Sequence, residues 1–366
     1  MRPIDMNELQ TPPQARPQLY SLQVLRFVAA FAVVLFHFGS GLTVEYNLST
    51  NYFGIGAAGV DIFFVLSGFI ICYSANPARG PIYFFRRRIA RVVPLYWLLT
   101  LGLIVIALFW KGLLNSTVID AESVIKSFLF IPFEKSNGMI QPILFLGWTL
   151  CYEMFFYLVF GICLLAGRNA SWFASGIILT LVLIGRIWPE GSAPWRFYTN
   201  PILVEFVIGM LIYNAYMSSS RLKAGSNVVA VLLLVAAPVL HTLSTKWAGP
   251  GVITSAIFAA TIVLAFLVVR VEKSNTLMFF VLLGDASYSL YLIHPYTLQF
   301  PVKLLGKHLS FELLTLVLAA TTALTVIVSI YVFRWIEKPA QDILLGRFKG
   351  FTNRTSLQSE TPSALV

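Results

Sequence analysis

The sequence carries little charge. Of its 366 residues only 11% are Asp, Glu, Lys or Arg, whereas 58% are hydrophobic. A soluble domain has roughly 25% charged and about 45–50% apolar residues, so the apolar excess here is too large to bury in one soluble core. The apolar residues gather in runs of about the 17–25 residues that a helix needs to cross the hydrocarbon layer. The composition therefore predicts an all-α, polytopic integral membrane protein.

Cysteine is also scarce. Cys72, Cys151 and Cys163 all fall in apolar runs, without the spacing of a metal site or a disulfide framework. We interpret them as packing residues, with a nucleophilic Cys151 as the alternative, and we expect neither a metal nor a permanently bound cofactor. Internal repeats, which many secondary transporters contain, are missing as well.

Ten apolar segments are predicted to span the membrane, and the seventh is the weakest because it is short and contains Pro238. A further segment, 120–133, is predicted to lie at the interface or to re-enter the membrane. One transmembrane domain would cover 19–339, between a tail at 1–18 and a polar tail at 340–366 that we predict to be disordered. The predicted spans are 19–41, 56–75, 92–111, 145–166, 171–187, 201–217, 226–241, 251–271, 277–298 and 312–335.

The net charge of +10 follows this topology and does not suggest a nucleic-acid surface. With the N-terminus in the cytoplasm, the inner segments hold roughly twice as many Lys and Arg residues as the outer ones, as the positive-inside rule requires. Ten spans then leave both termini in the cytoplasm; if the seventh segment does not span, everything after it inverts. The first apolar run has no cleavage signal behind it, so we expect a retained helix.

Few ionisable residues fall inside the predicted spans, and each is a functional candidate because charge is costly there. Five of them lie in the outer third of their predicted helices: His37, Asp61, Glu153, Glu205 and His294. Groups at one depth on five helices predict one polar cavity that opens to the outside. Structural roles stay open as alternatives: helix–helix hydrogen bonding for the three carboxyl groups, and packing for the two histidines.

Arg26 and His37 are predicted to share one face of the first helix. Eleven residues advance a helix by about 1100°, which leaves roughly 20° of offset and about 16 Å along the axis. On the cytoplasmic side, between the second and third predicted spans, lies a basic block. Arginine suits phosphate because its planar fork donates two hydrogen bonds at once, but such a block also serves topology or binds anionic lipid headgroups. The block contains Arg86, Arg87, Arg88 and Arg91.

At these residues the sequence resembles the membrane acyltransferase 3 family, from about residue 19 to residue 339. Arg26 and His37 match in the first helix, with ten residues between them. Thr149 stands where relatives often have Ser, which keeps the hydroxyl group. The resemblance is to the exopolysaccharide-modifying members of the bacterial inner membrane. The other matching blocks follow in the family's order: 59–71 with Asp61, the basic block with 94–97 after it, 147–157 with Glu153, 200–210 with Glu205, 287–295 with His294, and 336–339.

The resemblance implies transfer of an acyl group, usually acetyl, from cytoplasmic acyl-CoA to a hydroxyl of a surface polysaccharide or its lipid-linked precursor. His37 would be the general base, or would carry the acyl group as an acyl-imidazole, and Asp61 or Glu153 would orient it. Arg26 and the basic block would hold the CoA phosphates. The acceptor would be bound by Trp148, Glu205 and His294.

Two other classes of protein also place charges within the membrane. A transporter or flippase of a lipid-linked glycan lines its substrate path with them, and a non-catalytic partner of a polysaccharide synthase needs no reaction. Acyl transfer by the purified chain would distinguish an enzyme from both. The expected partners are the bilayer, the acyl donor and the glycan, and not nucleic acid.

Overall fold

The computed structural model describes residues 17–109, 119–249 and 251–347. Within these ranges the chain is helical, and the one extended pairing is an isolated antiparallel bridge between Glu134 and Ile140. The predicted all-α class is confirmed. The α-helices are α1 (Tyr20–Glu45), α2 (Ala58–Ser74), α3 (Gly80–Phe109), α4 (Ala121–Phe128), α5 (Gly147–Cys163), α6 (Ala170–Ile187), α7 (Ala193–Tyr198), α8 (Val204–Ser218), α9 (Ser220–Ala224), α10 (Asn227–Ala248), α11 (Val252–Val268), α12 (Asn275–Asp285), α13 (Ser287–Leu305), α14 (Phe311–Val332) and α15 (Lys338–Leu344).

Among the described residues, seven helical segments are long and apolar enough to cross a membrane, or eight if the bent pair α12–α13 is one span. One of the seven holds both α5 and α6, which are separated at Gly167, a residue with φ of +59°. The apolar helix α11 is shorter, at 17 residues. Each predicted span thus contains a helix, and the chain is a multi-pass membrane protein; the count of ten crossings and their orientation stay predictions.

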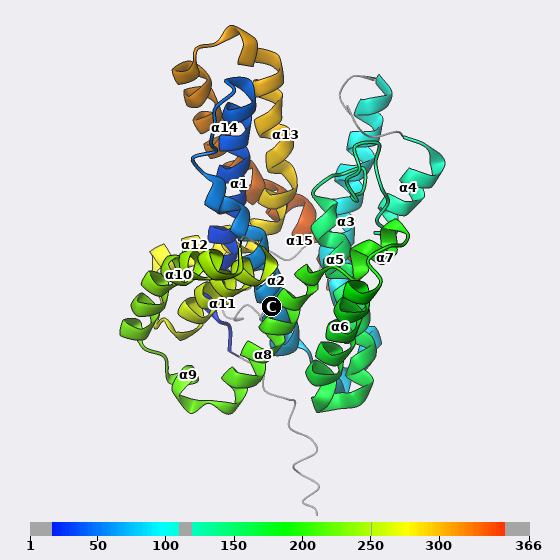
Figure 1. The fold of residues 1–366 in the computed structure, drawn as a ribbon, viewed down its shortest axis with the longest axis vertical. Coiled ribbons are helices and arrows are strands. Elements are labelled where there is room, and N and C mark those ends of the chain that lie inside the picture. The colour runs from blue at the N-terminus through cyan, green and yellow to red at the C-terminus, as the bar shows by residue number, and fades with distance from the viewer. Residues whose placement is uncertain (1–16, 110–118, 250, 348–366) are drawn as a thin grey trace, which may run out of the picture.

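Two columns of helices rise from a lower layer (Figure 1). In that view α1, α13 and α14 form the upper left column, and α3 with α4 forms the upper right one. The lower left holds α10, α11 and α12, and the lower right holds α5 and α6. Helix α8 packs against both α2 and α6, and so joins the two sides of the bundle.

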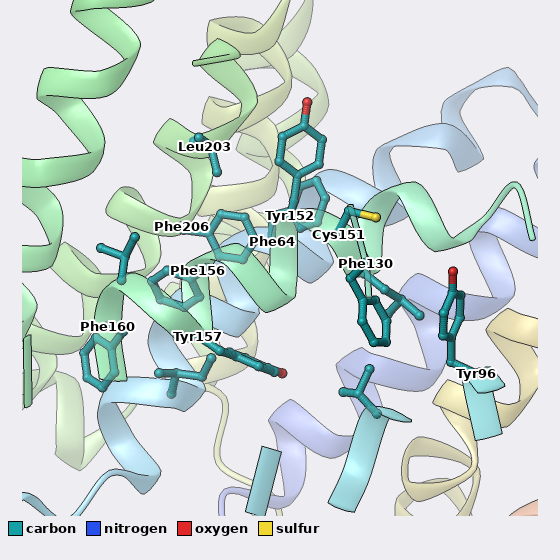
Figure 2. Close-up of a cluster of buried hydrophobic side chains, with 14 of the residues drawn as sticks. Phe64, Tyr96, Phe130, Cys151, Tyr152, Phe156, Tyr157, Phe160, Leu203 and Phe206 are labelled. Atoms are coloured by element: carbon teal, nitrogen blue, oxygen red, sulfur yellow. The ribbon is translucent and has the colours of Figure 1, made fainter. Parts of the chain in front are cut away.

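Helices α2 and α8 approach closely because glycines lie at their contact. A Cβ atom on Gly209 would lie 2.0 Å from the carbonyl oxygen of Val65, and one on Gly68 would lie 2.2 Å from that of Phe206. Small residues at such contacts are how helices associate in lipid, where apolar burial gives little driving force. Next to the contact, the rings of Phe156 and Phe206 stack at 4.5 Å inside the buried cluster that Figure 2 shows.

The helix of the predicted third span begins earlier than the span itself was predicted to begin. The basic block does not precede the helix: α3 begins at Gly80 and continues through the arginines, with Pro94 inside it, to Phe109. Arginine is a good helix former, and burial of Arg88 against Ser74 on α2 holds this part of the helix to the bundle. Hydropathy did not predict the first turns of α3, because a run of arginines lowers the hydropathy there and so marks the end of an apolar span.

The predicted ninth span, 277–298, is two helices bent by 62° between α12 and α13. At the bend Gly284 lies so near α1 that a Cβ atom there would be 2.0 Å from the carbonyl oxygen of Gln23. The predicted seventh span is α10, whose 22 residues are long enough to cross despite Pro238. The predicted interfacial segment 120–133 contains α4.

The first residues of the predicted C-terminal tail are helical. Residues 340–344 belong to α15, where Gln341 donates to Glu337 and Lys338 donates to Asp342, at 3.1 Å in each case. The remainder of that tail beyond residue 347 lies outside the described residues, as do residues 1–16 of the predicted N-terminal tail.

The contact of α2 with α8 yields a test. Gly209→Ala should lower the Tm of the purified protein in detergent, because overpacking of a tight contact costs about 1–3 kcal/mol. Gly102→Ala on α3 is the control, since nothing lies within 4 Å of an added Cβ atom there. Its Tm should be unchanged or slightly raised, because alanine favours helix. An equal Tm for the two variants would contradict the close approach.

Candidate functional site

A cavity lies among α1, α2, α3, α5 and α13, with an empty volume of about 910 Å³ that is partly open to the outside of the chain. We call it the central cavity. Its apolar lining includes Phe63, Phe64 and Leu150. Its polar and charged lining is Gln23, Arg26, Ser67, Arg88, Arg91, Thr149, Glu153, Tyr157, Ser287, Tyr288 and Tyr291.

Three arginines from two helices line this cavity, and we call Arg26, Arg88 and Arg91 the arginine cluster. Arg88 and Arg91 are three residues apart, so both lie on the same face of α3. Arg26 is in the second turn of α1, and its Nη1 donates to the side-chain oxygen of Gln23 at 3.1 Å. The cluster gives one end of the cavity the donors that phosphate or carboxylate groups bind.

Arg88 is the most buried of the cluster, with 6% of its surface exposed. It donates to the hydroxyl of Ser74, and its guanidinium carbon lies 5.5 Å from the ring centre of Phe84 and 5.8 Å from that of Tyr157. Its Nε atom is buried and has no hydrogen-bond partner in the described part of the chain. A bound anion would supply that missing acceptor.

Carboxylates accompany the arginines. Glu153 accepts hydrogen bonds from the hydroxyls of Tyr157 and Ser67, and it is a charged neighbour of Arg26 and Arg88. Glu337 accepts from Ser289 at 2.7 Å. Asp285 and Glu337 both lie near enough to Arg26 and Arg91 to interact with their charges. The prediction from sequence included neither Glu337 nor its partner Ser289 as a site residue.

The structure separates the basic block into two halves. Arg88 and Arg91 line the cavity, whereas Arg86 is exposed and lies 3.5 Å from the carbonyl oxygen of Leu344. Arg87 lies over the ring of Tyr83, at 5.8 Å, and not in the cavity lining. The helical repeat explains the place of Arg86, which projects about 140° away from Arg91. Arg87 is one turn from Arg91, and its side chain packs on Tyr83 instead.

At the other end of the cavity a polar chain leads toward His37. The hydroxyls of Tyr291 and Thr149 are 3.0 Å apart. One turn further along α13, the ring of His294 lies 6.0 Å from that of Tyr291 and 5.2 Å from that of His37. His37 is outside the cavity lining, but these two residues of α13 connect it to the cavity.

The two histidines have different surroundings. His294 is fully buried; its Nδ1 lies 3.2 Å from the carbonyl oxygen of Leu290, and its Nε2 has no partner among the described residues. His37 is partly buried and packs edge-on against Phe36 and Phe145, with ring centres 5.1 and 5.9 Å away. In the described ranges no group of three His, Cys, Asp or Glu side chains could hold a metal ion.

The predicted orienting carboxylates lie elsewhere. No described hydrogen bond or ion pair joins Asp61 or Glu153 to His37. Glu153 lies with the arginine cluster, and Asp61 lies beside Glu205 at the contact of α2 with α8. Glu205 is fully buried, and its nearest polar partner is the carboxyl group of Asp61. Trp148, on the first turn of α5, packs edge-on against Phe64 of the cavity lining at 6.2 Å.

The predicted single outer cavity is therefore not what the fold forms: the five groups occupy three places. Depth counting fails because α2, which runs antiparallel to α1, begins well below the end of α1. A Cβ atom on Gly56 would touch Ala32, one on Gly59 would touch Ala29, and the chain before α2 bonds to α1 through Asn51 and the carbonyl oxygen of Phe36. Asp61 thus lies well below His37. The spacing of Tyr288, Tyr291 and His294, three residues each, was the signal for the face that connects them.

Comparison with known proteins identifies the fold's relatives. The family described as "Acyltransferase domain" matches residues 19–334. The chain is 37% identical over 261 residues to the "Exopolysaccharide production protein ExoZ" of Rhizobium meliloti, a match that covers 69% of this chain and 80% of that protein. It is 26% identical over 327 residues to the "Acyltransferase MdmB" of Streptomyces mycarofaciens, covering 80% and 82%.

A third relative is the "Putative peptidoglycan O-acetyltransferase YrhL" of Bacillus subtilis. The identity is 26% over 355 residues, which covers 85% of this chain and 54% of that longer protein. No solved structure matches the chain.

Proposed function

This chain belongs to the acyltransferase family whose domain matches residues 19–334 and is a membrane O-acyltransferase, and from that premise we propose its donor, acceptor and catalytic groups. The donor is a cytoplasmic acyl-CoA, with acetyl as the acyl group. The acceptor is a hydroxyl of a cell-surface or exported polysaccharide, or of its lipid-linked precursor. Family membership favours the enzyme over the transporter and the non-catalytic partner.

One observation carries this proposal: the central cavity has an arginine cluster at one end, and from Thr149 and Tyr291 at its other end His294 leads to His37. Coenzyme A has the matching polarity, with phosphates at one end and a thioester at the other. Helix α1 is continuous from Arg26 to His37, so these residues are about 16 Å apart along its axis. That length is comparable to the reach of a pantetheine arm.

The residues have separate roles in this reaction. Arg26, Arg88 and Arg91 bind the donor phosphates, and Glu153 holds the guanidinium groups in position. Arg86 and Arg87 lie outside the cavity lining and attract the anionic donor through their charge alone. For Asp61 and Glu205, which lie beside each other at the contact of α2 with α8, we propose a structural role in that contact, in which the two carboxyl groups share one proton. Trp148 and His294 remain the candidates for the acceptor side, where His294 also packs against His37 and limits the rotation of its ring.

The chemistry needs only one base. The acceptor oxygen attacks the thioester carbonyl carbon while His37 takes the hydroxyl proton, and the carbon–sulfur bond then breaks. The imidazolium returns that proton to the leaving thiolate, so the products are the ester and free CoA. An acyl-imidazole on His37 is the alternative, in which the imidazole nitrogen attacks first and the acceptor hydroxyl takes the acyl group second.

The sidedness follows from the same arrangement. The N-terminal turns of α1 and α3 carry the arginine cluster and face the cytoplasm, as the excess of basic residues on that side supports. The chain would then lie in a bacterial inner membrane, with both termini inside and the acceptor outside. The relative from Rhizobium meliloti bears a name that refers to exopolysaccharide production, which supports a polysaccharide acceptor.

His37→Ala should lower acetyl transfer by the purified chain about 10²–10⁴-fold, the usual contribution of a general base. His308→Ala is the matched control, because His308 is exposed in the connection between α13 and α14. Release of free CoA and formation of acetylated glycan measure the activity at equal membrane levels. Normal activity of His37→Ala would exclude both the base and the acyl-imidazole.

Arg88→Gln should raise the KM for acetyl-CoA at least ten-fold and change kcat less, because a charge-assisted hydrogen bond contributes about 1.5–3 kcal/mol. Arg86→Gln should change KM less than two-fold, since that side chain is exposed and outside the cavity lining. Initial rates against acetyl-CoA concentration give both constants. Equal effects of the two substitutions would mean that the basic block acts as a diffuse charge and not through the cavity.

A further inference from the structure

A second polar pocket lies away from the central cavity, where α4, α7 and the segment between α4 and α5 meet. Its empty volume is about 860 Å³, also partly open. We call it the Lys135 pocket. Helix α4 packs on α3 past the arginine cluster, through hydrogen bonds from Tyr96 to Ser127 and from Trp97 to Phe128. In the proposed orientation the pocket is therefore on the external side. Its lining is Asp120, Glu122, Ser123, Lys126, Pro132, Phe133, Glu134, Lys135, Ser136, Ser192, Ala193 and Pro194.

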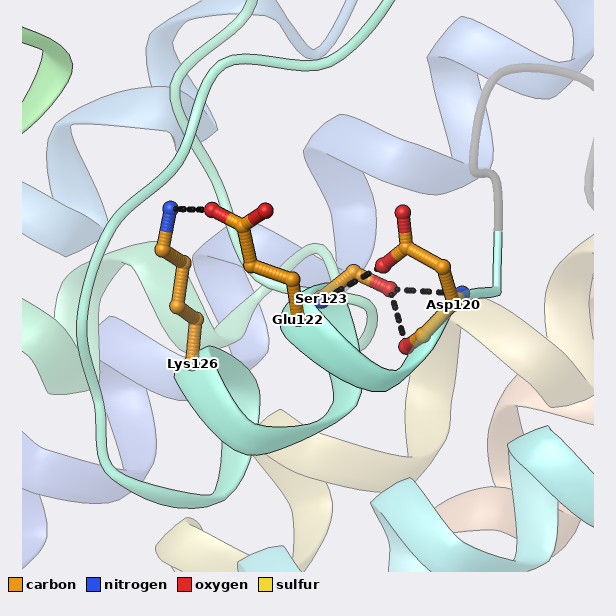
Figure 3. Close-up of polar contacts among 4 residues, drawn as sticks. All are labelled: Asp120, Glu122, Ser123 and Lys126. Atoms are coloured by element: carbon orange, nitrogen blue, oxygen red, sulfur yellow. Dashed lines mark hydrogen bonds and ion pairs between the residues drawn. The ribbon is translucent and has the colours of Figure 1, made fainter.

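Most charges around this pocket already have partners. Lys126 pairs with Glu122 one turn away on α4, and Asp120 caps the helix by accepting a hydrogen bond from the backbone of Ser123, as Figure 3 shows. Across the pocket, Arg196 of α7 pairs with Glu134. These ion pairs use Glu122 and Glu134, and the third acid, Asp120, is used by the helix cap. One cation of the lining has no such contact in the described part of the chain.

That cation is Lys135, which has 7% of its surface exposed. Its backbone bonds to Met139, but no described acceptor bonds its ammonium group. Burial lowers the pKa of this lysine from 10.5 to about 8, and no neighbouring charge opposes that shift. A buried cation that keeps its charge at neutral pH without a counter-ion is costly, so the pocket is suited to a bound anion.

The segment around Lys135 is held in place. The backbone N–H of Lys135 donates to Met139 at 2.9 Å, and that of Gln141 donates to Phe133 at 3.1 Å, which closes a short hairpin. The residue just before the hairpin stretch, Phe130, stacks on Tyr96 of α3 at 4.5 Å. The pocket thus has a defined shape before any ligand binds, which reduces the entropy cost of binding.

The same segment also reaches the reaction centre. After the hairpin the chain is buried at Ile143 and Leu144. The next residue, Phe145, packs on His37, with the two ring centres 5.9 Å apart. A ligand held at Lys135 would therefore lie on the segment that packs on the catalytic histidine. This arrangement favours the acceptor over an unrelated anion.

We propose that the Lys135 pocket binds a carboxylate of the acceptor glycan, so that the polysaccharide acylated by this enzyme is an acidic one. The inference rests on the proposed function and deepens it by naming the class of acceptor. The ammonium group pairs with a uronic-acid or other carboxylate-bearing sugar, while a neighbouring sugar hydroxyl extends toward His37.

The test measures binding apart from catalysis. The full chain, in nanodiscs of phosphatidylcholine, is titrated with oligogalacturonate and with a neutral dextran oligosaccharide of equal length. Oligogalacturonate should bind at least ten-fold tighter than dextran, and Lys135→Gln should remove that preference. Lys307→Gln, an exposed lysine beyond α13, is the matched control and should keep it. The His37→Ala variant should bind normally, so failure of the catalytic proposal and failure of this one are distinguishable.

A pH series adds a readout that a structural role would not change. Binding needs the protonated amine, so affinity should be full at pH 7 and fall about ten-fold by pH 9. Lys135→Arg should keep its affinity over that range, because arginine stays protonated. The other ionisable groups at the pocket, Asp120, Glu122, Lys126, Glu134 and Arg196, are the same in both proteins.

Three results would overturn the proposal. The first is equal affinity for the two oligosaccharides, and the second is an unchanged preference in Lys135→Gln. The third is loss of the preference when phosphatidylglycerol is added, which would assign the pocket to lipid phosphate.

Discussion

A guanidinium group inside an apolar bundle needs partners, and this requirement organises the centre of the protein. Isolated charge is costly in a membrane, and one carboxylate rarely offsets the loss of hydration. Around Arg26, Arg88 and Arg91 the chain therefore collects acids and hydroxyls from distant segments: Glu153 of α5, Asp285 of α12, and Glu337 between α14 and α15. The cluster joins helices from both halves of the sequence.

The arginine cluster has many polar neighbours, but not every guanidinium N–H has an acceptor among the described residues. The cavity can therefore bind an anion. Arg88 has a buried Nε atom without an acceptor in the described chain, while Glu153 already accepts from two hydroxyls. A site of this kind can take up an anion without first breaking a closed ion pair. The opposite end differs: His37 and His294 lie among aromatic rings, and no described carboxylate bonds to either imidazole.

The sequence was enough to predict the all-α class and the apolar helical segments. Of the residues predicted for the site, Arg26, Arg88, Arg91 and Glu153 line one cavity, although Glu153 was expected beside His37. It could not predict which charged groups meet, because that depends on where each helix starts relative to its neighbours. Asp61 illustrates this: it is near the start of α2, but α2 packs low on α1, so Asp61 meets Glu205 and not His37. The bend after Asp285, which brings His294 beside His37, depends on a contact between Gly284 and α1 that no local pattern reveals.

The central claim is that the donor phosphates bind the arginine cluster of the central cavity, and that the catalytic histidine lies just beyond the opposite end of that cavity. A structure of the chain in nanodiscs with a non-hydrolysable acetyl-CoA analogue tests it most directly. The account predicts phosphate density at Arg26, Arg88 and Arg91, and the acyl carbon within about 3.5 Å of the site an acceptor oxygen would take beside His37. An analogue bound with its nucleotide elsewhere, or with its acyl end pointing away from His37, would contradict the account.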